Sequence, residues 1–129
     1  STNTTTYPTP PAPPASPSDV SGYPLAAFDA TKFTHVEWVD GKVHEAGFTA
    51  AFTPNTVVTV SGTDVDYIAA TESSLGDTYA AVTARSYHAN GVNVVLMDGS
   101  VRFVNNSITL ATWRGLATRA GGEVLANDY

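Results

Sequence analysis

The fold of this chain is decided by residues 86–104, which read SYHANGVNVVLMDGSVRFV. Two apolar runs rich in valine flank the pair Asp98-Gly99. Both central residues of a type I′ turn need positive φ angles, and Asp and Gly tolerate these best. The pattern therefore predicts a β-hairpin with Asp98-Gly99 at its tip.

A second pair of the same kind, Asp40-Gly41, lies between residues 34–39, which alternate in polarity, and residues 42–46. It predicts a second hairpin, in which Val36 and Trp38 or their alternates face the core. Residues 69–78 are expected to form a loop. The same reasoning predicts further strands over residues 55–61, 64–68 and 79–86.

One helix is expected near the C-terminus, from Leu110 to Arg119, because apolar residues recur there at helical spacing. Ser107 or Thr109 can cap its start, and Gly121-Gly122 is expected to stop it. The predicted fold class is mainly β, a β-rich α+β fold. It consists of an antiparallel sheet or a sandwich of hairpins, one C-terminal helix and an extended Pro-rich N-terminal arm.

The chain is predicted to divide into an arm, residues 1–18, and a globular β-rich domain, residues 19–129. Residues 1–17 hold six of the eight prolines, which favours polyproline II. Seventeen such residues span about 50 Å, far more than the radius of gyration of about 13 Å expected for 100 residues.

The arm has three interpretations: a flexible linker, a glycosylated stalk, or an arm that adds to a neighbouring subunit, with residues 2–7 pairing as a strand. The stalk would carry its glycan at Asn3-Thr4-Thr5. The candidate subunit contacts are Thr4, Thr6, Tyr7, Pro8, Pro10, Pro11, Pro13 and Pro14.

Composition excludes several classes of function. Six basic against twelve acidic residues give a net charge of −6, which argues against binding to nucleic acid or anionic lipid. The sequence contains no membrane-spanning apolar run. The absence of cysteine excludes disulfides and thiolate metal sites.

Candidate chemistry is sparse. The three histidines, His35, His44 and His88, are candidate ligands for a metal ion, but a structural hydrogen bond is the favoured role of His88. No nucleophile motif or nucleotide fingerprint occurs, so no enzymatic activity is expected. No cofactor is expected. Calcium in an acidic loop is the one alternative, at Asp64, Asp66, Glu72 and Asp77.

His88, nine further residues and Asp98-Gly99 together resemble the signature of a large bacterial family of prepilin-like (type IV pilin-like or pseudopilin-like) proteins of unknown function. The resemblance covers residues 33–126 and includes Asp40-Gly41 and Leu110–Arg114. Such proteins begin with a basic leader and an apolar pilin helix, whereas this chain starts Ser1-Thr2-Asn3. We therefore expect either a processed C-terminal part of a longer precursor or a gene that has lost the pilin helix.

The resemblance and the arm together suggest a structural subunit of an extracellular filament or cell-surface assembly. It would form a homopolymer by self-association through the N-terminal arm, either as a donated strand or as polyproline II. The alternative is a pseudopilin-like binding module or secretion-system component that recognises a glycan or an exported protein.

Overall fold

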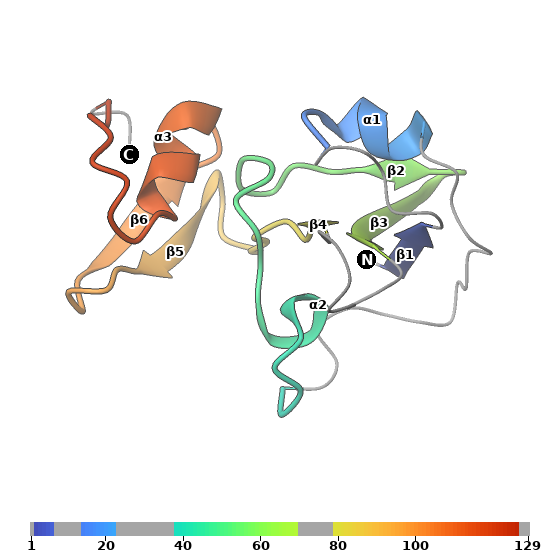
Figure 1. Ribbon diagram of the computed structural model, residues 1–129, viewed down its shortest axis with the longest axis horizontal. Helices are drawn as coiled ribbons and strands as arrows, with labels where there is room; N and C mark the ends of the chain where they lie inside the picture. Colours follow the sequence, from blue (N-terminus) through green and yellow to red (C-terminus); the bar gives the residue numbers. More distant parts are fainter. Residues whose placement is uncertain (1, 7–13, 23–37, 70–78, 127–129) are drawn as a thin grey trace.

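The computed structural model describes residues 2–6, 14–22, 38–69 and 79–126. These residues form two small β-sheets and three short helices (Figure 1). The predicted β-rich α+β fold class is confirmed. Among the described residues, no helix has the length and hydrophobicity needed to cross a membrane.

The first sheet is built around β3 (Thr63–Ala69), which pairs with three other strands. On one side lie β2 (Thr59–Val60) and β4 (Ala80–Ala81), both antiparallel to it. On the other side lies β1 (Thr2–Thr6), which runs parallel. Ser61 (φ 50°) and Gly62 (φ 80°) join β2 to β3, so the positive φ values of a type I′ turn occur here.

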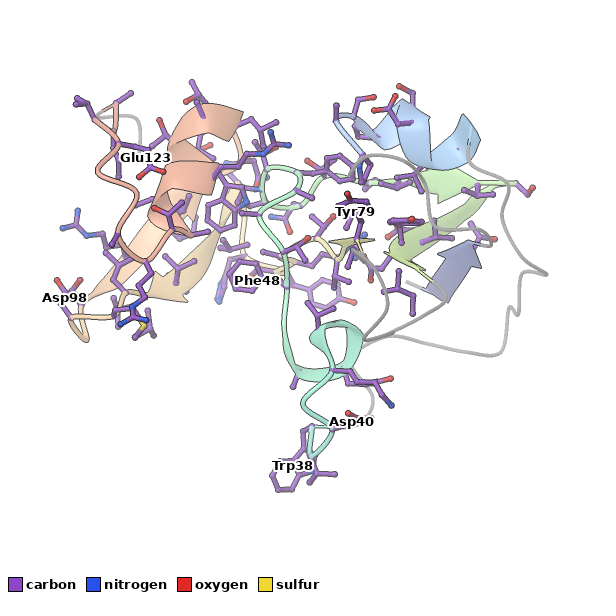
Figure 2. All side chains as sticks on the ribbon, in the orientation of Figure 1. Trp38, Asp40, Phe48, Tyr79, Asp98 and Glu123 are labelled. Atoms are coloured by element: carbon purple, nitrogen blue, oxygen red, sulfur yellow. The ribbon has the colours of Figure 1, made fainter. Side chains whose placement is uncertain are left out.

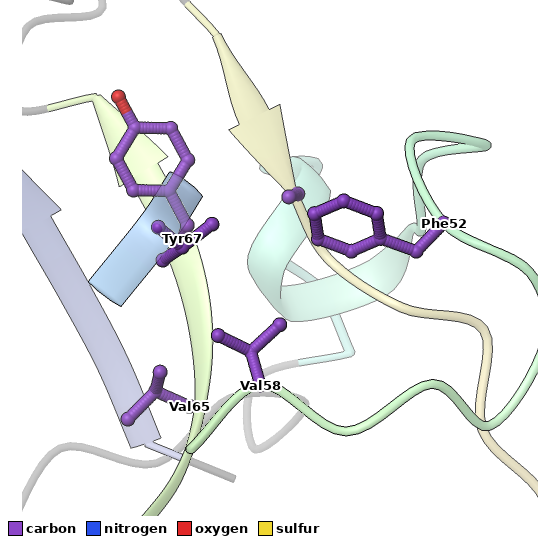
Figure 3. Packing of buried hydrophobic residues seen from close by; sticks show 6 residues of the cluster. Phe52, Val58, Val65 and Tyr67 are labelled. Carbon is purple, nitrogen blue, oxygen red and sulfur yellow. The ribbon is translucent and has the colours of Figure 1, made fainter. Parts of the chain in front are cut away.

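One face of this sheet carries the larger hydrophobic core. Val65 and Tyr67 alternate along β3 and pack against Phe52, Val58 and nearby side chains (Figure 3). Helix α1 (Pro17–Gly22) contributes Val20 to the same core. The core therefore joins segments distant in sequence around a single strand.

Helix α1 begins inside the range that was predicted to be an arm without a helix. Pro17 occupies the first helical position, where a missing N–H costs nothing. The carboxylate of Asp19 accepts hydrogen bonds from the backbone N–H groups of Ser16 (2.8 Å) and Ala15 (2.9 Å). This reach from the third helical position back to the cap is the geometry of a capping box, which the sequence analysis overlooked.

The second sheet is the predicted hairpin of β5 (Gly91–Val95) and β6 (Val101–Asn105), with Val92 opposite Val104. The predicted type I′ turn is wrong. Leu96 N–H donates to the Ser100 carbonyl, so the loop is Met97-Asp98-Gly99, and only Gly99 (φ 83°) has positive φ. A three-residue hairpin loop of this kind ends in a left-handed glycine, here Gly99. Asp98 Oδ1 stabilises the loop by accepting hydrogen bonds from Ser100 N–H (2.9 Å) and Ser100 Oγ–H (2.7 Å).

Helix α3 (Leu110–Leu116) covers this hairpin, and Trp113 packs against Val92 and Val104 as expected. Thr109 caps its start and accepts a hydrogen bond from Thr112 N–H, as predicted. The helix ends before the predicted glycine stop. The hydroxyl and N–H groups of Thr118 both donate to the Gly115 carbonyl. These bonds satisfy a carbonyl of the last helical turn, so the helix ends several residues before Gly121.

The second predicted hairpin is wrong in its returning strand. Residues 34–37 lie outside the described residues, and Val43–Ala46 form helix α2. Asp40 Oδ1 accepts the backbone N–H of Lys42 at 3.1 Å, a local side-chain turn that leads into the helix rather than into a strand. Trp38, expected as a core candidate, is 87% exposed.

Candidate assembly site

Strand β1 occupies the free edge of β3, in a register that runs from Thr2 opposite Val65 to Thr6 opposite Ala69. β1 is an edge strand because β2 and β4 take the other side of β3. Its sequence, TNTTT, brings no aliphatic or aromatic side chain to the sheet. The ladder of backbone hydrogen bonds, rather than apolar burial, therefore holds β1 in place.

β3 is anchored on its second face by charge. Arg85 donates from Nη1 to Asp66 Oδ1 (2.5 Å) and from Nη2 to Asp64 Oδ1 (3.2 Å). Asp66 is completely buried and also accepts the backbone N–H of Thr83 at 3.3 Å. A buried carboxylate is tolerated only when it is paired and hydrogen-bonded, so Arg85 is the group that lets Asp66 lie inside.

The described anchors of β3 lie in the body of the chain. Val65 and Tyr67 pack against apolar residues from position 20 onward, and Asp64 and Asp66 form ion pairs with Arg85. β3 thus presents a strand-accepting edge that is anchored from the body. In chemical terms the site is a row of backbone donors and acceptors, suited to adding one strand.

The predicted arm residues fall in three places. Asn3, Thr4, Thr5 and Thr6 belong to β1, and Asn3 lies opposite Asp66. Pro14 is buried and lines a cavity of about 380 Å³ with Ala50, Ala51 and Arg114 among its walls. The remaining predicted contacts, Tyr7, Pro8, Pro10, Pro11 and Pro13, lie outside the described residues. Residues 2–6 thus pair as a strand within one chain.

The structure does not bring the motif residues His88 and Asp98 together. His88 precedes β5 and Asp98 follows it, so the strand separates them, and Asp98 lies at the tip of the hairpin (Figure 2). His88 is exposed, and its backbone N–H donates to Ser86 Oγ at 3.1 Å. The nine-residue spacing therefore corresponds to one strand and its flanks.

Asp98 and Gly99 have a local role at the hairpin tip. The hydroxyl and backbone N–H of Ser100 donate to the Asp98 carboxylate and hold the pKa of Asp98 below its ordinary value of 3.8. Asp40-Gly41 forms the comparable turn before α2, where Lys42 Nζ also lies 2.8 Å from Asp40 Oδ2. Both Asp-Gly pairs thus shape turns.

The candidate cation ligands do not converge where the structure describes them. Asp64 and Asp66 are bound by Arg85, while Glu72, Asp77 and His35 lie outside the described residues. His44 is in α2. No group of three or more His, Cys, Asp and Glu side chains gathers within the described ranges.

Sequence analysis missed two residues that organise the site, Arg85 and Asn55. The signal for Arg85 was present: Asp64 and Asp66 share one face of a predicted strand, and such a pair needs a cation if it is buried. Asn55 has positive φ (58°), accepts Ser86 N–H and donates to Asn106. No local pattern marks a residue whose partners lie in three separate loops.

The profile of one family, described as protein of unknown function DUF1559, matches residues 15–111. The chain belongs to this family. DUF1559 is a pilin-like, prepilin-associated family of unknown function, in agreement with the resemblance found in the sequence. No curated protein and no solved structure gives a significant match to the chain.

The DUF1559 match extends from the residue before the α1 cap to the start of α3, and it includes β3 with its anchors. Strand β1 lies outside the matched residues. The accepting edge therefore belongs to the DUF1559 body of this chain, whereas the strand that fills the edge lies outside it.

Proposed function

We propose that the chain is a structural subunit of an extracellular filament or cell-surface assembly, in which β1 of one copy fills the β3 edge of the next. The observation that carries this proposal is the pairing of β1 with the edge of β3 as a strand. Membership in a pilin-like family supports it.

Exchange of β1 between copies replaces each contact within a chain by an equivalent contact between chains. A strand from another copy makes the same ladder hydrogen bonds as the chain's own strand, as in domain swapping. Because the sequence of β1 has no aliphatic or aromatic residue, its departure removes no large apolar side chain from the sheet. A strand exchanged from head to tail does not close on itself, so repeated exchange builds a linear assembly.

The sequence between β1 and α1 favours exchange over closure. Five prolines fall between residues 8 and 14. Each proline fixes φ and removes a backbone donor, so the segment resists tight reversal. A segment of this composition favours polyproline II, which extends by about 3.1 Å per residue, and it is therefore long enough to carry β1 to a neighbouring copy.

Cross-linking between two different single-cysteine variants tests the proposal. Thr5 and Ile68 are register partners, and the native chain has no cysteine. We expect Thr5→Cys mixed with a size-tagged Ile68→Cys to give a disulfide-linked heterodimer on non-reducing gels under mild oxidation. Neither variant can form this bond within one chain.

The matched control mixes Thr5→Cys with Ser107→Cys, because Ser107 is exposed in the turn after β6, in the second sheet. Equal linking in the two mixtures, or unlinked chains in both, would refute strand exchange. A deletion of residues 1–6 gives a second test, because it removes β1 and leaves Pro17 and Val20 in α1 intact. We expect this deletion to abolish polymerisation.

The alternative, a binding module for a glycan or exported protein, is favoured by one observation. A cavity of about 320 Å³ between the two sheets is lined by Asn55, Asp64, Arg85 and the exposed Tyr87, among others. An exposed aromatic ring beside fixed donors and acceptors suits a polar ligand with an apolar face. Calorimetric titration with neutral oligosaccharides would support this alternative if binding depended on Tyr87, tested with Tyr87→Ala.

A further inference from the structure

Trp38 is the most unusual exposed side chain in the described part of the molecule. It is 87% exposed, and the adjacent Val39 is 74% exposed. Both lie on a turn that projects from the body below α2, and Trp38 points outward at its end (Figure 2). Tryptophan is rarely so exposed in monomers, and it is among the residues most enriched at the centres of interfaces.

The turn that carries Trp38 is held in one conformation. Lys42 donates from its backbone N–H (3.1 Å) and from Nζ (2.8 Å) to the carboxylate of Asp40. Helix α2 starts directly afterwards, where Glu45 and Ala46 N–H groups both donate to the Lys42 carbonyl at 3.0 Å. A side chain presented on an ordered turn loses less entropy on binding than one on a flexible loop.

A pocket of about 260 Å³ lies on the other side of α2, beside β5. An apolar cavity of about 150 Å³ holds a benzene ring, so this pocket has room for an indole. Phe48 is half exposed and stacks on Trp113 with ring centroids 5.8 Å apart, which leaves its second face open. The walls include Phe48, Val92 and Val94 with the polar residues Thr83, Arg85 and Asn93.

The polar groups of the pocket match an indole rather than an aliphatic chain. Thr83 is buried in the inner wall, and its Oγ1 has no hydrogen-bond partner among the described residues. An unpaired buried hydroxyl costs free energy until it receives a donor such as an indole N–H. Arg85 lines the same pocket, and a guanidinium that pairs with carboxylates, as Arg85 does with Asp64 and Asp66, can still stack on the face of an aromatic ring.

We propose that Trp38 of one copy inserts into this pocket of a second copy. The chain's own Trp38 points away from the body, so the contact joins two different surfaces of two chains (Figure 2). A knob and a pocket at separate places form a head-to-tail contact, which continues into a filament instead of closing a dimer.

The size of this contact sets its role. One tryptophan buries about 150–250 Å², against about 800 Å² per partner in a stable interface. The Trp38 contact therefore fixes the orientation of copies already joined through β1, and the inference rests in this respect on the proposed self-association. It makes the assembly specific rather than supplying most of its affinity.

Tryptophan fluorescence of the full chain tests the inference. The chain has two tryptophans, and Trp113 Nε1 has no hydrogen-bond partner among the described residues, so Trp113→Phe leaves Trp38 as the sole indole without breaking a described hydrogen bond. We expect the emission of Trp38 to shift to shorter wavelength and to resist acrylamide as the protein assembles. We also expect Trp38→Ala, in the native background, to raise the concentration needed for assembly at least about tenfold.

Two further variants locate the contact. Ala46→Phe adds bulk at an exposed position of the pocket wall and should weaken assembly as Trp38→Ala does. Met97→Ala removes another fully exposed apolar side chain outside this pocket and should leave assembly unchanged.

If the protein assembled while acrylamide still quenched Trp38 fluorescence fully, the Trp38 contact would be overturned and strand exchange would stand. Burial of Trp38 that does not depend on concentration would also overturn it, because the chain would then be filling its own pocket. If Ala46→Phe assembled like the native chain, the assigned pocket would be wrong. Absence of both assembly and Thr5–Ile68 cross-linking would overturn this contact together with the proposed function.

Discussion

The side-chain amide of Asn55 joins the two sheets through Asn106, with Asn55 Nδ2 lying 2.8 Å from Asn106 Oδ1. The same Asn55 accepts Ser86 N–H at 2.9 Å, and its backbone N–H donates to the Ala84 carbonyl at 2.9 Å. These bonds hold the loop before β2, the loop before β5 and the turn after β6. Asn55 therefore connects the β3 sheet to the β5–β6 hairpin.

Replacing Asn55 should destabilise the whole fold. Asn55→Ala removes the side-chain bonds to Ser86 and Asn106 and places Ala at a φ of 58°. Each lost bond costs about 1 kcal/mol and the left-handed conformation about 1 kcal/mol more, so we expect a loss of about 3 kcal/mol in urea unfolding. Asn55→Gly keeps the backbone relaxed and should lose about 1 kcal/mol less. Equal losses would show that the backbone conformation is unstrained.

Gly91 should tolerate no side chain. A Cβ at this first residue of β5 would overlap the Val104 carbonyl and lie 2.6 Å from Phe103 Cζ. Because the carbonyl belongs to the paired strand, it cannot move without breaking the ladder. We expect Gly91→Ala to cost about 3 kcal/mol in thermal or urea unfolding, at the upper end for overpacking. Gly41→Ala is the matched control, since nothing lies within 4 Å of its Cβ, and it should be nearly neutral.

Removing Arg85 should be far more damaging than removing its exposed partner. Arg85→Met removes the ion pair of the buried Asp66, and breaking such a pair costs about 3 kcal/mol or more. Asp64 is 39% exposed, so Asp64→Asn should cost less than about 1 kcal/mol. Denaturant unfolding of the two variants measures this difference. Similar losses in both would mean that the Asp66–Arg85 pair contributes no more than a surface pair.

Asp98 should titrate below pH 3.8 in the folded protein, because the hydroxyl and N–H of Ser100 stabilise its carboxylate. Since the folded pKa is the lower one, this contribution to stability is present above pH 3.8 and is lost as the pH falls through the folded pKa. NMR titration of the side-chain carboxyl should show Ser100→Ala raising the pKa of Asp98. Ser107→Ala, in the similar turn at Asn105, should leave it unchanged. An unchanged pKa in Ser100→Ala would assign the depression to another cause.

Local pattern predicted those elements whose partners lie close in sequence. β5 and β6 are separated only by a short loop, and their alternating valines match the observed pairing of Val92 with Val104. Helix α3 begins at Leu110 and buries Trp113, as its spacing indicated. The error at Asp98-Gly99 was one of turn type, because hydrogen bonds to Ser100 favour a longer loop than the dipeptide alone suggests.

The predictions were wrong where a local sequence pattern was compatible with two different local structures. Asp40-Gly41 has the sequence of a hairpin turn, yet the chain continues into α2, because Asp40 binds Lys42 and no partner strand follows. Alternation alone predicts that Val36 and Trp38 or their alternates face a core, but alternation indicates a core only when another layer covers that face. The prolines of residues 1–17 predict a segment without helix, although Pro17 at the first turn of α1 is compatible with the helix.

The β-rich class, the β5–β6 hairpin and the C-terminal helix could be predicted from the sequence, because each depends on residues that lie close together along the chain. The family was recognised from motifs spread over residues 33–126. The folded chain alone shows that β1 fills the edge of β3, that Arg85 neutralises Asp66, and that Asn55 links the two sheets. These contacts join residues 19 to more than 60 positions apart. The reason is that hydrogen-bonding edges and buried charges take whichever partner the packed chain brings to them, and no local periodicity records that partner.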